Sequence, residues 1–135
     1  MAAVCAALAG CSNSDNGPST PRIGLSCVDD SSHCIGQRGK VFDQYMADKS
    51  RSWVKEPATP EAYASGVRLF ALSKRRRELN CDELAHARRE AEAGPAILRA
   101  NANGLTPAQV SRGVMLAGEV ERDLRREHDR RCRKT

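Results

Sequence analysis

The apolar residues of this chain recur with the period of a helix, and this pattern constrains the fold more than any other feature. From residue 41 onward, apolar side chains return every three or four positions, which places them along one face of an α-helix. No segment combines period-two alternation with β-branched enrichment, as a strand would. We therefore expect an all-α domain, a small up-down bundle of four to five helices with short connections.

Capping residues indicate where several of these helices begin. Thr59 precedes a proline, which suits the first turn of a helix, and Asn80 and Thr106 each open a capping box. Gly94-Pro95 predicts a kink or a break in the helix that Asn80 starts. The segment 23–39 is polar between its two cysteines, Cys27 and Cys34, and is typical of a loop.

The body of the chain contains an internal echo with a spacing of 47 residues. The pattern Cys-x24-Thr-Pro-x5-Gly-Val-x-Leu starts at Cys34 and again, without gaps, at Cys81. A duplicated helical hairpin would give the units 34–80 and 81–127, and two similar helix starts arising by chance is the alternative.

The chain starts with an apolar, uncharged run that ends in Leu8-Ala9-Gly10-Cys11, after which it turns polar at once. A leucine, two small residues and a cysteine resemble the lipobox of bacterial lipoproteins. The resemblance implies that 1–10 is a signal peptide and that the Cys11 thiol carries a diacylglycerol. No Lys or Arg follows Met1, unlike the usual signal, so an alanine-rich start of a cytosolic protein is the alternative.

The resemblance also implies a domain organisation and a cellular location. Residues 11–26 would hold the lipidated cysteine and a flexible tether rich in Gly, Pro and Ser, and 27–135 would form the helical domain. Acyl chains on Cys11 would anchor the protein to a membrane of the bacterial cell envelope, facing the periplasm. Ser12, in place of an aspartate, favours the outer membrane by the same resemblance.

The class of partner that the net charge indicates depends on the compartment in which the protein is found. The formal net charge is +5, which in the periplasm suits anionic lipid, a glycolipid or an acidic envelope protein. The same charge in the cytosol would suggest nucleic acid, which we do not expect here. Aromatic residues make up only 4% of the chain, so the core is thin and needs covalent staples.

Disulfide bonds between the cysteines can provide these covalent cross-links. Loss of Cys5 with the signal and lipidation of Cys11 leave four cysteines, and this even number predicts two disulfides in an exported domain. Hairpin turns near 57–59 and 104–106 would gather all four at one end of the bundle. The pairings considered are Cys27–Cys34 with Cys81–Cys132, which we favour, and Cys34–Cys81 with Cys27–Cys132.

Metal binding is the rival use of these cysteines. His33 adjoins Cys34, and His128 lies one helical turn before Cys132, which is a ligand-like spacing. The chain has no Cys-x2-Cys, and its other ligand types lack the spacing of a structural zinc site. We expect no metal and no other cofactor.

No motif points to catalysis. The sequence lacks a nucleophile elbow, a dinucleotide fingerprint and a phosphate loop. The carboxylate pairs Asp29-Asp30 and Asp82-Glu83 are typical of a polar loop and of a first helical turn. We therefore expect no catalytic residues and no enzyme activity.

Two basic clusters remain, at 74–77 and within 122–134. Acidic residues are interspersed among the basic ones in the second cluster. This is typical of a solvated helix with ion pairs between side chains one turn apart. The functional alternative is that both clusters lie at one pole and meet phosphate groups or an acidic partner. The candidate contacts are Lys74, Arg75, Arg76, Arg77, Arg130 and Arg131.

These features predict a lipid-anchored envelope protein with a non-enzymatic accessory or interaction role. An envelope ligand-binding or inhibitor module is the first alternative, and a concave apolar pocket between helices would favour it. A cytosolic zinc or nucleic-acid binder is the second, and it requires the lipobox to be a coincidence.

Overall fold

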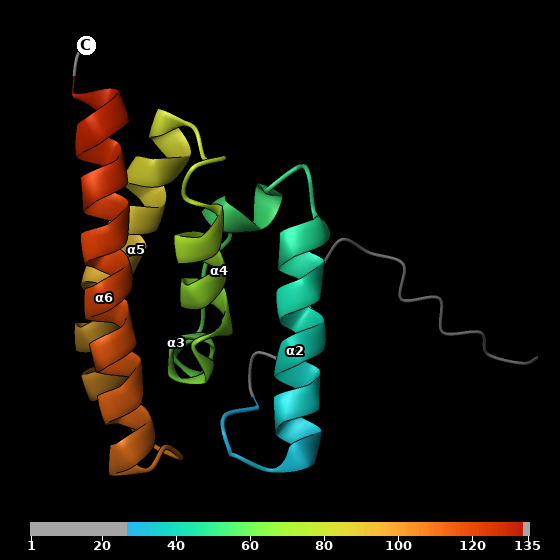
Figure 1. The fold of residues 1–135 in the computed structure, drawn as a ribbon. Coiled ribbons are helices and arrows are strands. Elements are labelled where there is room, and N and C mark those ends of the chain that lie inside the picture. Colours follow the sequence, from blue (N-terminus) through green and yellow to red (C-terminus); the bar gives the residue numbers. More distant parts are fainter. Residues whose placement is uncertain (1–26, 134–135) are drawn as a thin grey trace, which may run out of the picture.

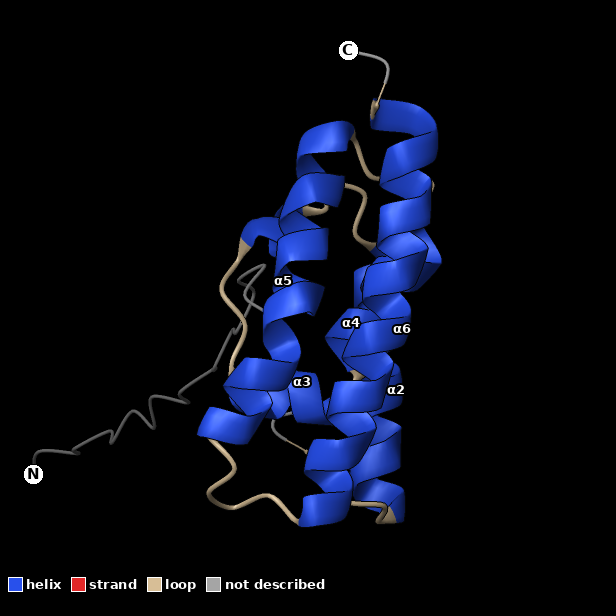
Figure 2. Ribbon diagram, turned by 90° about the vertical axis from the view of Figure 1, so that its left-hand side faces the viewer, coloured by secondary structure: helices blue, strands red, loops and turns tan. Residues whose placement is uncertain are grey.

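The computed structural model describes residues 27–133, and all regular structure in that range is helical (Figures 1 and 2). The predicted signal peptide, Cys11 and the proposed tether up to residue 26 lie outside the described residues. The expected all-α, disulfide-stapled bundle is confirmed. The elements are α2 (Ser32–Ala47), the 3₁₀ helix η1 (Ser52–Lys55), α3 (Pro60–Ser65), α4 (Val67–Arg75), α5 (Cys81–Ala100) and α6 (Pro107–Cys132).

Helices α2, α4 and α6 run in one direction and α5 runs in the other (Figure 1). The hydroxyl of Ser73 on α4 donates to Asp123 on α6 at 2.8 Å, and farther along both helices Arg131 donates to the carbonyl of Arg76. Between α2 and α4 the chain returns through Glu56 and Thr59, which both have extended backbone. The turn predicted near 57–59 is therefore an extended crossover, because two prolines in this segment disfavour helix.

The predicted helix starts at Thr59, Asn80 and Thr106 are confirmed, and each side chain accepts a backbone N–H of the first turn. The loop predicted over 23–39 is wrong from Ser32 onward, because α2 begins there. Ser31 caps this helix by accepting the N–H of Cys34 at 3.2 Å. A serine N-cap satisfies a donor that would otherwise be unpaired, so the helix starts well before its apolar stripe.

The helix that begins at Thr59 is broken at Gly66, which the sequence pattern did not indicate. Gly66 has a φ of 76° and separates α3 from α4. After the break, Phe70 on α4 points partly outward. Its side chain is 43% exposed and its ring centroid lies 5.3 Å from that of Phe42.

The break predicted at Gly94-Pro95 is absent, and α5 continues to Ala100. Gly94 lies where α5 packs on α6, and a Cβ added there would meet the Cβ of Ala117 at 3.3 Å. Pro95 removes one backbone hydrogen bond, and the long packing surface between the two helices sustains the rest.

The disulfides are Cys27–Cys34 and Cys81–Cys132, the favoured pairing, but they lie at opposite ends of the bundle. Val28 accepts a hydrogen bond from Gln109 in the first turn of α6, whereas Cys132 closes the last turn. The expectation that all four cysteines gather at one end is therefore wrong. The crossover through 56–59 carries the chain back along the bundle, so Cys34 and Cys81 are not level.

The core lies where α4, α5 and α6 meet, and it is mostly leucine and alanine. The aromatic pair Tyr45 and Trp53 closes it at the end where α2 stops, with ring centroids 4.2 Å apart. The fully buried leucines are Leu69, Leu72, Leu79, Leu84, Leu98 and Leu124.

Gly113 on α6 lies against the backbone of α3. A Cβ added at Gly113 would meet Leu98 Cδ1 at 2.7 Å and the carbonyl oxygen of Tyr63 at 3.3 Å. Gly66, its counterpart in the 47-residue echo, faces Leu116 of α6 in the same way. The duplication itself stays a prediction.

We expect Gly113→Ala to lower the free energy of unfolding by about 1–2 kcal/mol, measured by urea denaturation. Overpacking costs about 1–3 kcal/mol, and only part of that is offset by the better helix propensity of alanine. The control is Gly36→Ala in α2, where an added Cβ meets nothing within 4 Å. It should stabilise by about 0.5–1 kcal/mol. Equal effects of the two variants would contradict this account of the α3–α6 contact.

Candidate functional site

The two predicted basic clusters do meet, at the end of the bundle where α4 and α6 stop and α5 starts. Arg131 Nη2 donates to the carbonyl of Arg76 at 2.9 Å and to that of Leu79 at 2.6 Å. We call this end, with Lys74, Arg77 and Arg130 on it, the basic pole. Its contact with an anionic surface stays a prediction.

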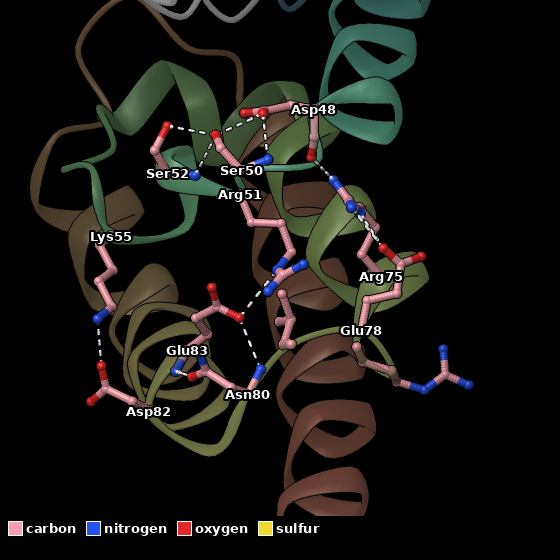
Figure 3. A network of polar contacts seen from close by, with 12 residues as sticks. Asp48, Ser50, Arg51, Ser52, Lys55, Arg75, Glu78, Asn80, Asp82 and Glu83 are labelled. Carbon is pink, nitrogen blue, oxygen red and sulfur yellow. Dashed lines mark hydrogen bonds and ion pairs between the residues drawn. The ribbon is translucent and has the colours of Figure 1, made fainter.

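Arg75 does not contribute to that surface. Its side chain is 4% exposed and turns inward, as Figure 3 shows. The guanidinium donates to the carbonyl of Tyr45 at 2.7 Å, to the carbonyl of Asp48, and to Glu78 at 2.6 Å. Arg75 thereby ties the end of α2 to the end of α4, so its role is structural.

Several other charges at this pole are engaged within the protein. Arg130 and Arg131 both bind the buried carboxylate of Glu127, at 2.5 and 2.7 Å. Lys74 lies over the Phe70 ring with its Nζ 5.1 Å from the centroid. Arg77 is exposed, and no acidic side chain within 27–133 pairs with it. The outward-facing charge is therefore smaller than the sequence suggested.

The carboxylate pair Asp82-Glu83 also has cationic partners (Figure 3). Glu83 closes the capping box on Asn80 and accepts from Arg51 at 3.2 Å. Lys55 pairs with Asp82 and holds the pKa of that carboxyl below its usual range. Both acids stabilise the start of α5, in agreement with first-turn helix chemistry.

A buried ion pair that the sequence did not reveal links α4 to α5. Arg68 is 1% exposed, and its guanidinium binds Glu90 through two contacts of 2.5 and 3.1 Å. It also donates to the carbonyls of Glu56 and Val54, and it lies 5.7 Å from the centroid of the Trp53 ring. An arginine inside the apolar stripe of α4 was the only signal in the sequence.

A small polar pocket of about 250 Å³ opens beside this ion pair. Tyr63, His86, Arg89 and Glu90 line it, together with the crossover. Burial, with the nearby Glu90 carboxylate, raises the pKa of Tyr63 to about 12, so the phenol stays protonated at neutral pH. Glu90 is committed to Arg68, so it is not placed to act as a general base.

A larger, apolar groove of about 470 Å³ lies at the end of the bundle away from the basic pole, where α5 turns into α6. The apolar side chains of Leu105, Val110, Val114 and Met115 line it, and so does Arg99. Val110 and Val114 belong to the apolar stripe of α6, yet both are only half-buried. The stripe extends beyond the helices that cover it, and this leaves an apolar surface facing outward.

In the pair His128 and Cys132 on α6, which has ligand-like spacing, the Cys132 thiol is not free to bind a metal because it is bonded to Cys81. The His128 Nδ1 atom is buried without a hydrogen-bond partner. Within residues 27–133, no group of three or more His, Cys, Asp or Glu is arranged to hold a metal ion. In the same range, no helix has the length and apolar character needed to span a bilayer.

Comparison of the chain with protein-family models, with curated proteins and with solved structures gave no match. A function for this chain has to come from its own residues and contacts.

Proposed function

We propose that the chain is a lipid-anchored protein of the bacterial cell envelope with a non-enzymatic accessory role. The observation that carries the proposal is the pairing of all four cysteines downstream of Cys11 in two disulfides. Such pairing is typical of exported proteins and rare in the cytosol. Of the six cysteines, only Cys5 and Cys11 are not in these bonds, and both belong to the segment that resembles a lipoprotein signal.

The fold supports an arrangement in which the basic pole faces away from the anchor. The chain enters the domain at Cys27, beside the start of α6, whereas the basic pole lies where α6 ends. A helix of 26 residues is about 39 Å long. With the entry end of the domain toward the anchoring leaflet, Lys74 and Arg77 face away from it and suit an acidic envelope partner.

The anchor is tested by expressing the full chain in a bacterium behind a start that supplies the missing basic residues, with labelled palmitate. We expect label on the protein, and an intact mass that matches residues 11–135 plus acyl chains. Reduction of the two disulfides should raise this mass by that of about four hydrogen atoms. Cys11→Ser should abolish the label, and the matched control Cys5→Ser should keep it. An unprocessed mass with free thiols would indicate a cytosolic protein and would contradict the lipid anchor.

A second candidate function is a ligand-binding module of the envelope, and the apolar groove is the observation that favours it. Ligand sites are concave, mostly apolar and edged by a few polar groups, with volumes of about 300–1,000 Å³. At about 470 Å³, the groove between α5 and α6 falls within that range.

A further inference from the structure

The apolar groove presents its hydrophobic side chains to solvent. Met115 is 65% exposed, more than any other large hydrophobic residue of the range 27–133. Leu105, Val110 and Val114 continue the same surface toward the turn between α5 and α6. A contiguous apolar surface of this kind indicates a binding site for an apolar group.

One of the residues that line this groove is a cation, Arg99. No ion pair or side-chain hydrogen bond within 27–133 engages Arg99. Arg112 on α6, in contrast, binds Asp30 at 3.2 Å. A free guanidinium beside an apolar groove offers a phosphate its preferred partner while the groove takes a hydrocarbon chain.

The groove lies at the end of the bundle where the chain arrives from Cys11. Gln109, next to Val110, donates to the carbonyl of Val28 at 3.4 Å. The Cys27–Cys34 disulfide holds this entry point against α2. The 15 residues between Cys11 and Cys27 span at most about 50 Å when extended, so an anchor at Cys11 keeps this end within reach of the bilayer.

We propose that the groove binds an acyl chain of an anionic phospholipid of the anchoring membrane, with Arg99 on its phosphate. The proposal rests on the lipid anchor for its orientation and names the ligand class of the second candidate function. An anchored domain would then lie with the α5–α6 turn against the leaflet and its basic pole away from it. One apolar site and one cation match the two parts of a phospholipid.

The test uses the unlipidated full chain, Cys11→Ser, in flotation with vesicles of phosphatidylglycerol and phosphatidylethanolamine. In this background we expect Met115→Glu to reduce vesicle binding about tenfold, because a carboxylate replaces apolar contact. The matched control is Met46→Glu at the far end of α2, another exposed methionine, which should leave binding unchanged. Circular dichroism of each variant checks that the helices are retained.

The charge contribution is tested separately. Arg99→Glu should weaken binding to the anionic vesicles more than it weakens the lower binding to phosphatidylcholine vesicles, whose headgroups carry no net charge, and Arg77→Glu at the basic pole should have no effect. Equal losses for Met115→Glu and Met46→Glu would overturn the proposal. So would a dimer in solution that Met115→Glu dissociates, since a second copy would then occupy the groove. Because Cys11 is absent from this assay, failed lipidation in cells would remove the anchor without affecting the result.

Discussion

Glu90→Leu is expected to lower the free energy of unfolding by about 3–5 kcal/mol, measured by urea denaturation followed by circular dichroism. The Glu90 side chain is only 7% exposed, and its carboxylate pairs with the buried Arg68 guanidinium. Among the residues 27–133, its removal leaves the Arg68 cation inside the bundle with the backbone carbonyls of Val54 and Glu56 as acceptors. The cost of an unpaired buried charge exceeds the gain from an added apolar side chain.

The double variant Arg68→Met, Glu90→Leu separates the ion pair from simple loss of packing. We expect it to recover much of the stability that Glu90→Leu loses, because no buried charge remains. Lys55→Met, which breaks the exposed pair with Asp82, is the control and should cost less than about 1 kcal/mol. A double variant as unstable as Glu90→Leu would show that packing, rather than charge, governs this site.

Loss of the Cys81–Cys132 disulfide is the other change with a large expected effect. The bond closes a loop with a sequence separation of 51 and joins the start of α5 to the end of α6. In the chain-entropy model, a loop of this size contributes about 4 kcal/mol. For a domain with a thin core, that is a large part of the total, so Cys81→Ser with Cys132→Ser should lower the melting temperature by many degrees.

The other disulfide supplies the comparison. Cys27–Cys34 closes a loop with a sequence separation of only 7, for which the same model gives about 2–3 kcal/mol. Cys27→Ser with Cys34→Ser should therefore destabilise less than the first pair of substitutions. The reverse order would indicate that strain or unfolded-state structure, rather than loop closure, sets the contribution of these bonds.

The helix starts could be predicted because they depend on neighbours in the sequence. Thr59, Asn80 and Thr106 each accept a hydrogen bond from a residue three positions on. The α-helical class followed from the same local patterns. The break at Gly66 and the continuity of α5 through Pro95 were missed, because both depend on contacts with α6.

The surface was harder to predict than the helices. The sequence placed Arg75 with five other cations on an outward-facing surface, but Arg75 turns inward onto carbonyls of α2 and the loop after it. Arg68, which no pattern singled out, is the most deeply buried charged residue within 27–133. The apolar groove was also missed, because Val110 and Val114 have the pattern of core residues and only the packing leaves them half-covered.

Taken alone, the sequence determined the helical class, three helix starts and the set of cysteines available for pairing, because capping and periodicity act over a few residues. The tertiary structure decided the parallel course of α2 and α4, the separation of the disulfides to opposite ends, and the side chains left for binding. These features depend on which distant segments pack together. The extended crossover between Lys55 and Pro60 sets that packing, and no local pattern encodes its direction.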